Sequence, residues 1–154
     1  MQPANQTIII GVGNEYRGDD GAGLVVARKL RDRLNGDATV LELTGEFIAL
    51  MDAWERASSV ILIDAMQSGA APGMICRFEA QKESLPQNAF RSSTHTFGVT
   101  EAIELARTLN RLPRQLILYG IEGKSFAPGK GLSAEVWEAV QEVVRQVLAE
   151  PYWR

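Results

Sequence analysis

Residues 8–23 read IIIGVGNEYRGDDGAG, and this stretch decides the fold. The β-branched run at residues 7–13 ends on glycine, which predicts a strand buried on both faces. After GDDGAG the hydrophobic pattern changes to helical spacing, carried by Val26, Leu30 and Leu34. A buried strand that runs directly into an amphipathic helix opens a β-α-β unit, so the stretch predicts an α/β fold.

The same alternation of strand and helix patterns continues along the chain. Short apolar runs predict further strands at residues 39–43, 59–65, 74–78 and 114–122. Helical spacing predicts helices at residues 47–56 and 99–106 and a last helix with Ser133 as its N-cap. The polar residues 79–96 predict an irregular loop. We therefore expect one domain over residues 1–154, an α/β sandwich with a mainly parallel sheet.

Composition narrows the class of protein. The 154 residues are 45% hydrophobic and 23% charged, as in ordinary globular domains. The net charge of −3 gives no electrostatic attraction to nucleic acid or to anionic lipid. The single cysteine, Cys76, excludes an intramolecular disulfide and a cysteine-rich zinc site. No apolar run approaches 18 residues and no signal peptide opens the sequence, so we expect a cytoplasmic protein without a membrane partner.

Acidic residues follow the predicted strands at the points where the strands end. Glu15 comes after the first strand, Asp64 closes VILID, and Glu122 closes LILYGIE. In a parallel sheet Glu15 and Asp64 share one edge, and His95 can reach that edge from its loop. Two carboxylates and one imidazole, with room for outside ligands, form an open site for a divalent transition metal. Such a site polarises a carbonyl or activates water.

Each of these three residues also has a purely structural interpretation. Glu15 can be a solvated loop residue, and Asp64 can cap a neighbouring helix. His95 can hydrogen-bond within its own polar loop, SSTHT. The residue types alone leave both interpretations open.

The remaining features of the first motif favour a structural role. Asp19 and Asp20 directly precede a helix, where we expect them to shape and cap its amino terminus. The closely spaced glycines predict a tight exit from the strand that lets the backbone approach a partner protein.

Nucleotide-binding and serine-hydrolase motifs are excluded. The third glycine position of a G-x-G-x-x-G fingerprint holds Tyr16, and Glu15 would place negative charge against a pyrophosphate. GKS at residues 123–125 lacks the leading glycine of a phosphate loop, because that position is Leu118. The pattern G-x-S-x-G does not occur.

Five blocks, in the order GVGNEYRGDDGAG, ILIDA, STHTFG, YGIEG and GLSAEV, resemble the motifs of the hydrogenase maturation endopeptidases. The resemblance covers residues 8–140. It implies a twisted, mostly parallel sheet with helices on both faces. It also implies an aspartic-type endopeptidase that removes the C-terminal extension of a nickel-iron hydrogenase large-subunit precursor after nickel insertion.

The resemblance carries over three site residues. The metal-binding glutamate, aspartate and histidine of the family fall on Glu15, Asp64 and His95, which would act through the bound metal without separable roles. The metal would be nickel, supplied by the precursor, and the precursor would be the protein partner. Two alternatives remain: a non-proteolytic chaperone that inspects the metallated precursor, and a metal-dependent hydrolase of a small substrate.

One block departs from the family pattern. After the second predicted strand the family often carries aspartate-glycine-glycine-threonine, whereas residues 41–47 read LELTGEF. The threonine and a glycine are kept, and Glu42 is the residue that can partly replace the aspartate. We therefore predict no site residue in this loop.

Overall fold

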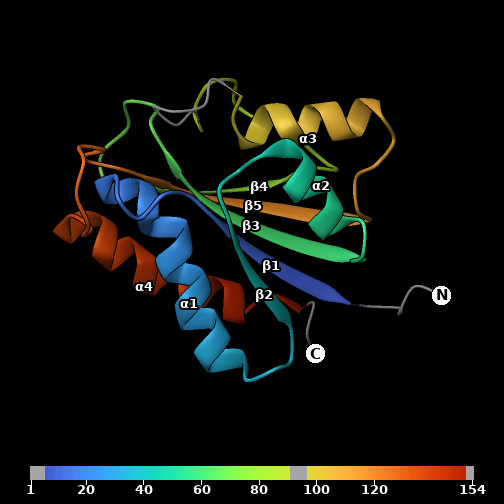
Figure 1. Ribbon diagram of the computed structural model, residues 1–154, viewed down its shortest axis with the longest axis horizontal. Helices are drawn as coiled ribbons and strands as arrows, with labels where there is room; N and C mark the ends of the chain where they lie inside the picture. Colours follow the sequence, from blue (N-terminus) through green and yellow to red (C-terminus); the bar gives the residue numbers. More distant parts are fainter. Residues whose placement is uncertain (1–5, 91–96, 152–154) are drawn as a thin grey trace.

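The computed structural model describes residues 6–90 and 97–151 (Figure 1). Within these residues, ten elements alternate much as the hydrophobic pattern predicts. They are β1 (Thr7–Val12), the short 3-10 helix η1 (Gly18–Gly21), α1 (Ala22–Leu34), β2 (Thr39–Leu43), α2 (Phe47–Trp54), β3 (Ser59–Met66), β4 (Ile75–Glu79), α3 (Val99–Thr108), β5 (Gln115–Glu122) and α4 (Ala134–Leu148).

The five strands form one sheet in the order β2-β1-β3-β5-β4. The first four are mutually parallel, and β4 pairs with β5 in the antiparallel direction. The predicted mostly parallel sheet is therefore confirmed. The registers Gly11 to Ile63 and Asp64 to Gly120 bring the carboxyl ends of β1, β3 and β5 to one edge.

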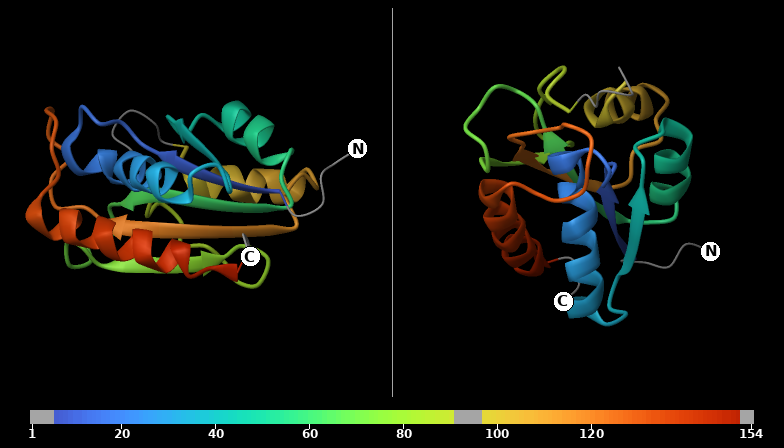
Figure 2. Two further views of the ribbon diagram at one scale, coloured as in Figure 1. Left: turned by 90° about the horizontal axis from the view of Figure 1, so that it is seen from below. Right: turned by 60° about the vertical axis from the view of Figure 1, so that its left-hand side comes forward.

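Helices cover both faces of the sheet, with α1 and α4 on one side and α2 and α3 on the other (Figures 1 and 2). Successive residues of a strand point to opposite faces, so the central strands supply both cores. Ile8, Ile10, Leu62 and Leu118 pack with Leu50, Trp54 and Ile103 from α2 and α3. Ile9, Ile61, Ile63 and Ile117 pack with Val26, Leu30, Val140 and Val143 from α1 and α4. The α/β sandwich is confirmed.

The glycines of the first motif serve the chain's own packing. A Cβ atom on Gly23 would lie 2.3 Å from the carbonyl oxygen of Ile63 and 2.6 Å from that of Val12. A Cβ on Gly11 would lie 2.3 Å from the carbonyl oxygen of Gly23. These glycines let the start of α1 lie directly on β1 and β3. The interpretation that they admit a partner protein is wrong, because the protein's own backbone occupies that space.

The expected capping of α1 by the two aspartates is also wrong. The N-cap residue of α1 is Gly21, and both aspartates lie before it in η1. The Asp19 carboxylate, 1% exposed, instead accepts hydrogen bonds from the amides of Lys124, Ser125 and Ser133 and from the Ser133 hydroxyl. Ser133 is the N-cap residue of α4, as predicted, but its hydroxyl is bonded to Asp19 rather than to its own helix. Asp19 therefore fixes the loop between β5 and α4.

Asp19→Ala is expected to lower the free energy of unfolding by about 3 kcal/mol, because several donors lose a charged acceptor in a buried place. Urea unfolding followed by circular dichroism measures the change. Asp19→Asn keeps one acceptor oxygen and is expected to lose about half as much. Equal stability of Asp19→Ala and the wild-type protein would contradict the anchoring role.

No helix within residues 6–90 and 97–151 has the length and apolar character needed to cross a membrane.

Candidate functional site

A small cavity of about 20 Å³ lies at the carboxyl edge of the sheet, with room for roughly one water molecule. Its walls come from the ends of β1 and β3, from η1, and from the loops that precede α2 and α3. The lining residues are Val12, Gly13, Asp20, Thr44, Gly45, Asp64, Phe90, Phe97, Gly98 and Val99. In open α/β sheets a ligand binds beyond the carboxyl ends of the strands, so this cavity is the expected place for a site.

Asp64 is the central acid of the cavity. It lies near the end of β3, is 5% exposed, and accepts a 2.8 Å hydrogen bond at Oδ1 from the amide of Ala65. Burial is the main cause that raises the pKa of Asp64 well above its ordinary value, and the charge of Asp20 raises it further. The bond from Ala65 acts in the opposite direction. Without a cation, Asp64 therefore holds its proton to a higher pH than an exposed aspartate does.

Asp20 is a second carboxyl group of this cavity that sequence reasoning assigned elsewhere. It is 6% exposed, lines the cavity, and acts electrostatically on Asp64. The sequence cue that could have identified Asp20 was the pair of adjacent aspartates in GDDGAG. Asp19 faces the β5–α4 loop, whereas Asp20 lines the cavity beside Asp64. Two carboxyl groups in one small cavity attract a cation or share a proton.

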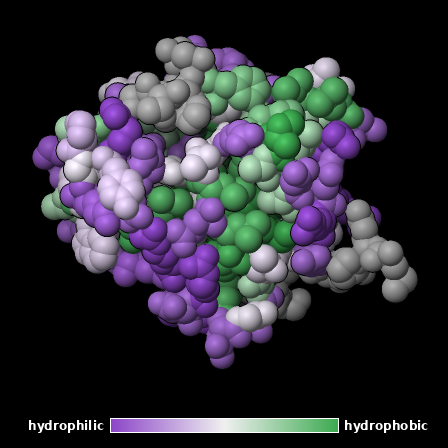
Figure 3. Space-filling model, in the orientation of Figure 1, coloured by the Kyte–Doolittle hydropathy of each residue, from purple (hydrophilic) through white to green (hydrophobic). Residues whose placement is uncertain are grey.

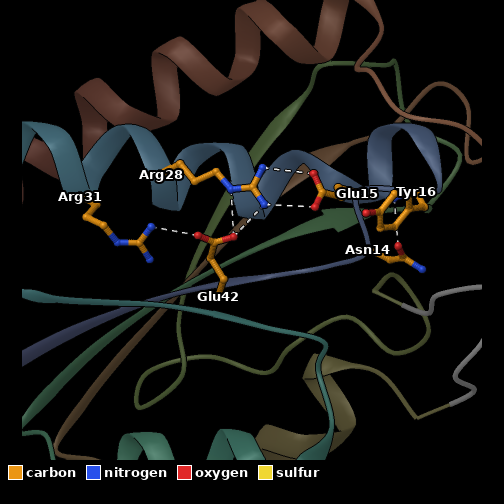
Figure 4. Close-up of polar contacts among 6 residues, drawn as sticks. All are labelled: Asn14, Glu15, Tyr16, Arg28, Arg31 and Glu42. Carbon is orange, nitrogen blue, oxygen red and sulfur yellow. Dashed lines mark hydrogen bonds and ion pairs between the residues drawn. The ribbon is translucent and has the colours of Figure 1, made fainter.

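Glu15 lies beside this edge but faces a different partner. Its carboxylate receives two hydrogen bonds from the Arg28 guanidinium, at 3.3 and 3.4 Å, and Glu15 is not among the residues that line the cavity (Figure 4). The Glu15 side chain is 33% exposed and that of Arg28 is 43% exposed. An ion pair so open to solvent is weak and exchanges its partners readily. Glu15 thus lies outside the cavity and is held by an ion pair with Arg28 that another partner can replace.

The divergent loop has a defined role in the same network. Glu42 of β2 accepts 2.9 Å hydrogen bonds from Nε of Arg28 and from Nη1 of Arg31 (Figure 4). Burial raises the pKa of Glu42, but the hydrogen bonds from Arg28 and Arg31 outweigh burial and leave that pKa below its ordinary value. Glu42 thus binds the arginines of α1, while Thr44 and Gly45 line the cavity. Arg28 and Arg31 lie on an exposed face of α1 and pair with the acids Glu15 and Glu42.

His95 lies outside the described residues. The described chain stops at Phe90 and resumes at Phe97, and both of these residues line the cavity. Among residues 6–90 and 97–151 no group of three His, Cys, Asp or Glu side chains is placed to hold a metal ion. The described part of the site therefore contributes at most an incomplete set of metal ligands.

Glu122, the other acid at a strand end, has a structural role. Its carboxylate accepts hydrogen bonds from the amides of Ser68 and Gly69 and from the Ser68 hydroxyl. It therefore fixes the turn that follows β3.

Known proteins resemble this chain in sequence and in fold. The hydrogenase expression/formation protein HupD of Thiocapsa roseopersicina is 24% identical over 151 residues, which are 96% of this chain and 68% of that protein. The NiFe hydrogenase maturation protease HybD from Thermococcus kodakarensis superimposes with a TM-score of 0.73 at 28% identity, covering 94% of this chain and 99% of that one. The hydrogenase maturating endopeptidase HybD from E. coli has the same fold, with a TM-score of 0.73 at 23% identity, over 94% of this chain and 90% of that one.

A family model described as hydrogenase maturation protease matches residues 25–150. That range contains Asp64, His95, the Thr44–Gly45 turn and nearly all of the helical residues. The match covers far more than half of the sequence, and the fold is that of the solved maturation proteases. The chain therefore belongs to the hydrogenase maturation protease family.

Proposed function

We propose that this protein is an endopeptidase that removes the C-terminal extension of a nickel-iron hydrogenase large-subunit precursor once nickel has been inserted. Family membership supports the class of reaction. The observation that carries the proposal is the placement of Asp64, buried and facing a small cavity beside Asp20 at the carboxyl edge of the sheet. A carboxylate in such a place attracts a cation much more strongly than it attracts a neutral molecule.

In this proposal Glu15, Asp64 and His95 bind the nickel that the precursor carries. Three ligands leave coordination positions for groups of the precursor. The chemistry of the described donors is compatible with this role, because Asp64 faces the cavity and Glu15 needs only to leave its exposed pair with Arg28. A precursor without nickel would lack the ion that these residues recognise.

Cleavage then proceeds by attack of water on a peptide bond close to the metal centre. The nickel of the substrate supplies positive charge that polarises the carbonyl or the water. Asp64 and Asp20 are the acids that line the cavity, and a carboxylate of this pair would be suited to accept the proton of the attacking water.

Incubation with nickel-loaded and nickel-free precursor, followed by intact-mass spectrometry, tests the function. We expect loss of the extension from the loaded precursor alone. Glu15→Gln and His95→Ala should each abolish the cleavage, and full-rate cleavage by either variant would overturn the site assignment. A loaded precursor that binds but keeps an intact C-terminus would indicate a chaperone, and nickel binding without any affinity for the precursor would indicate a hydrolase of small substrates.

A further inference from the structure

Strand β2 presents an open edge of the sheet. Within the part of the chain that the structure describes, it is the terminal strand and pairs with β1 alone. The carbonyl of Leu43 accepts a hydrogen bond from the Gly13 amide, so the backbone groups of Leu43 and, two residues earlier, Leu41 face β1. The backbone groups of Val40 and Glu42 therefore face outward. An edge of this kind is a template for an added strand.

The two faces of this edge differ in chemistry. Leu41 and Leu43 lie on the face shared with α2, and Ile48 beyond them is 55% exposed. Figure 3 shows hydrophobic surface over β2 and α2, beside a hydrophilic strip over α1. On the opposite face Glu42 holds Arg28 and Arg31. The edge therefore fits an extended segment that alternates apolar with polar or charged side chains.

The open edge is continuous with the candidate site. Leu43 ends β2, and the next two residues, Thr44 and Gly45, line the cavity that holds Asp64. A strand added to β2 therefore has one of its ends at the cavity. Five residues of β2 give a pairing surface of about 17 Å.

We propose that the C-terminal extension of the precursor binds by adding a strand to β2, antiparallel to it; this inference rests on the proposed function. The precursor residues that precede the cleaved bond belong to the part that presents the metal at the cavity. The extension begins at that bond and continues away from it. A chain that leaves the carboxyl end of β2 and runs along its edge is antiparallel to β2.

Arg31 occupies part of this edge in the free protein. Its Nη2 donates a 3.2 Å hydrogen bond to the outward carbonyl of Val40. The Arg31 side chain is 47% exposed, so an incoming strand can displace it at little cost. A charged side chain over an open edge also discourages pairing between two copies of the protein.

Amide hydrogen exchange of the wild-type protein, measured by NMR, tests the pairing directly. The probe is a synthetic peptide with the sequence of the extension. We expect the amides of Val40 and Glu42 to exchange fast in the free protein and at least about tenfold more slowly with the peptide, because each gains a hydrogen bond. The amides of Leu41 and Leu43 should change little. Unchanged exchange rates at Val40 and Glu42 under saturating peptide would overturn the proposal. It would also be overturned if these amides were already protected without peptide and the protection rose with protein concentration, because the edge would then pair two copies of the protein.

Processing of the nickel-loaded precursor provides the second test, with Glu42→Pro and Glu42→Ala as a matched pair. Both variants remove the carboxylate, but only proline removes the outward N–H, and an edge position tolerates proline. We expect kcat/KM of Glu42→Pro to be about tenfold below that of Glu42→Ala, mainly through KM. Equal kcat/KM values for the two variants would overturn strand addition but would not contradict the proposed endopeptidase function. Failure of the wild-type protein to cleave would remove both proposals, and a Glu42→Pro variant that does not fold leaves the exchange measurement to decide.

Discussion

Asp64→Asn is expected to lower kcat/KM for precursor processing by at least about 100-fold while the fold stays intact. Loss of a partner that only orients a metal ligand already costs about 10- to 100-fold, and Asp64 is proposed as a ligand itself. Asparagine has the same shape and keeps an oxygen that can accept the hydrogen bond from Ala65. Cleavage of the nickel-loaded precursor, quantified by mass spectrometry, measures the effect.

A control separates this effect from general damage near the cavity. Glu122→Gln changes another buried carboxylate at the end of a parallel strand, but one that only fixes a turn. It is expected to keep most of the processing rate. Processing by Asp64→Asn within a few-fold of the wild-type rate would remove Asp64 from the site.

Asp64→Asn is also expected to make the metal-free protein more stable than the wild-type protein, by a margin that grows as the pH rises. The folded protein holds the Asp64 proton more tightly than the unfolded chain does, because its pKa is raised by burial. Wild-type stability therefore falls as pH rises above about 3.9, the ordinary value in the unfolded chain, until the raised pKa is passed. The asparagine amide does not ionise, so the Asp64→Asn variant should gain on the wild-type protein by up to about 1.4 kcal/mol per pH unit in this window. Urea unfolding at a series of pH values from 4 upward measures the difference, and a difference that does not change with pH would contradict the raised pKa of Asp64.

Gly23→Ala is expected to destabilise the protein by more than about 3 kcal/mol. Helix propensity alone predicts the opposite sign, since alanine favours a helix by about 1 kcal/mol over glycine. The new Cβ, however, would meet two backbone carbonyl oxygens at 2.3 and 2.6 Å, and neither can move without separating α1 from β1 and β3. Overpacking against fixed backbone typically costs about 1–3 kcal/mol and sometimes more. Thermal and urea unfolding decide the sign.

Gly36→Ala is the matched control for this substitution. A Cβ at Gly36 would meet no atom within 4 Å, but the backbone has a positive φ of 96°. Its cost is therefore conformational strain alone, about 1–2 kcal/mol. If Gly23→Ala proved no worse than Gly36→Ala, the close approach of α1 to the strands would not be a constraint on the sequence.

The hydrophobic pattern predicts most of the fold, because burial on both faces leaves a clear signal in the strands. Residues 7–12 and 59–66 carry β-branched and apolar side chains that pack in the hydrophobic cores on both faces of the sheet. The position of Asp64 at a strand end followed from the same pattern. The direction of β4 did not, since a short strand after a turn has no marker of its direction.

The details of the site depend on contacts between distant residues, which no local pattern encodes. Asp19 and Asp20 are neighbours in sequence, yet one binds a loop more than 100 residues away and the other lines the cavity. The pairing of Glu15 with Arg28 likewise depends on where α1 lies over the sheet. These assignments required the tertiary structure, whereas the strand-end pattern and the family motifs had both pointed to Glu15, Asp64 and His95.

The hydrogen bonds of Asp19 have a consequence for when the proposed protease can become active. They join the amino-terminal motif to residues 124, 125 and 133, near the start of the last helix. During synthesis the motif emerges from the ribosome first, but its buried carboxylate lacks these partners until residue 133 has followed. The segment that carries Asp20 is therefore expected to be fixed only after residue 133 has been synthesised, so the proposed site should not assemble before that point.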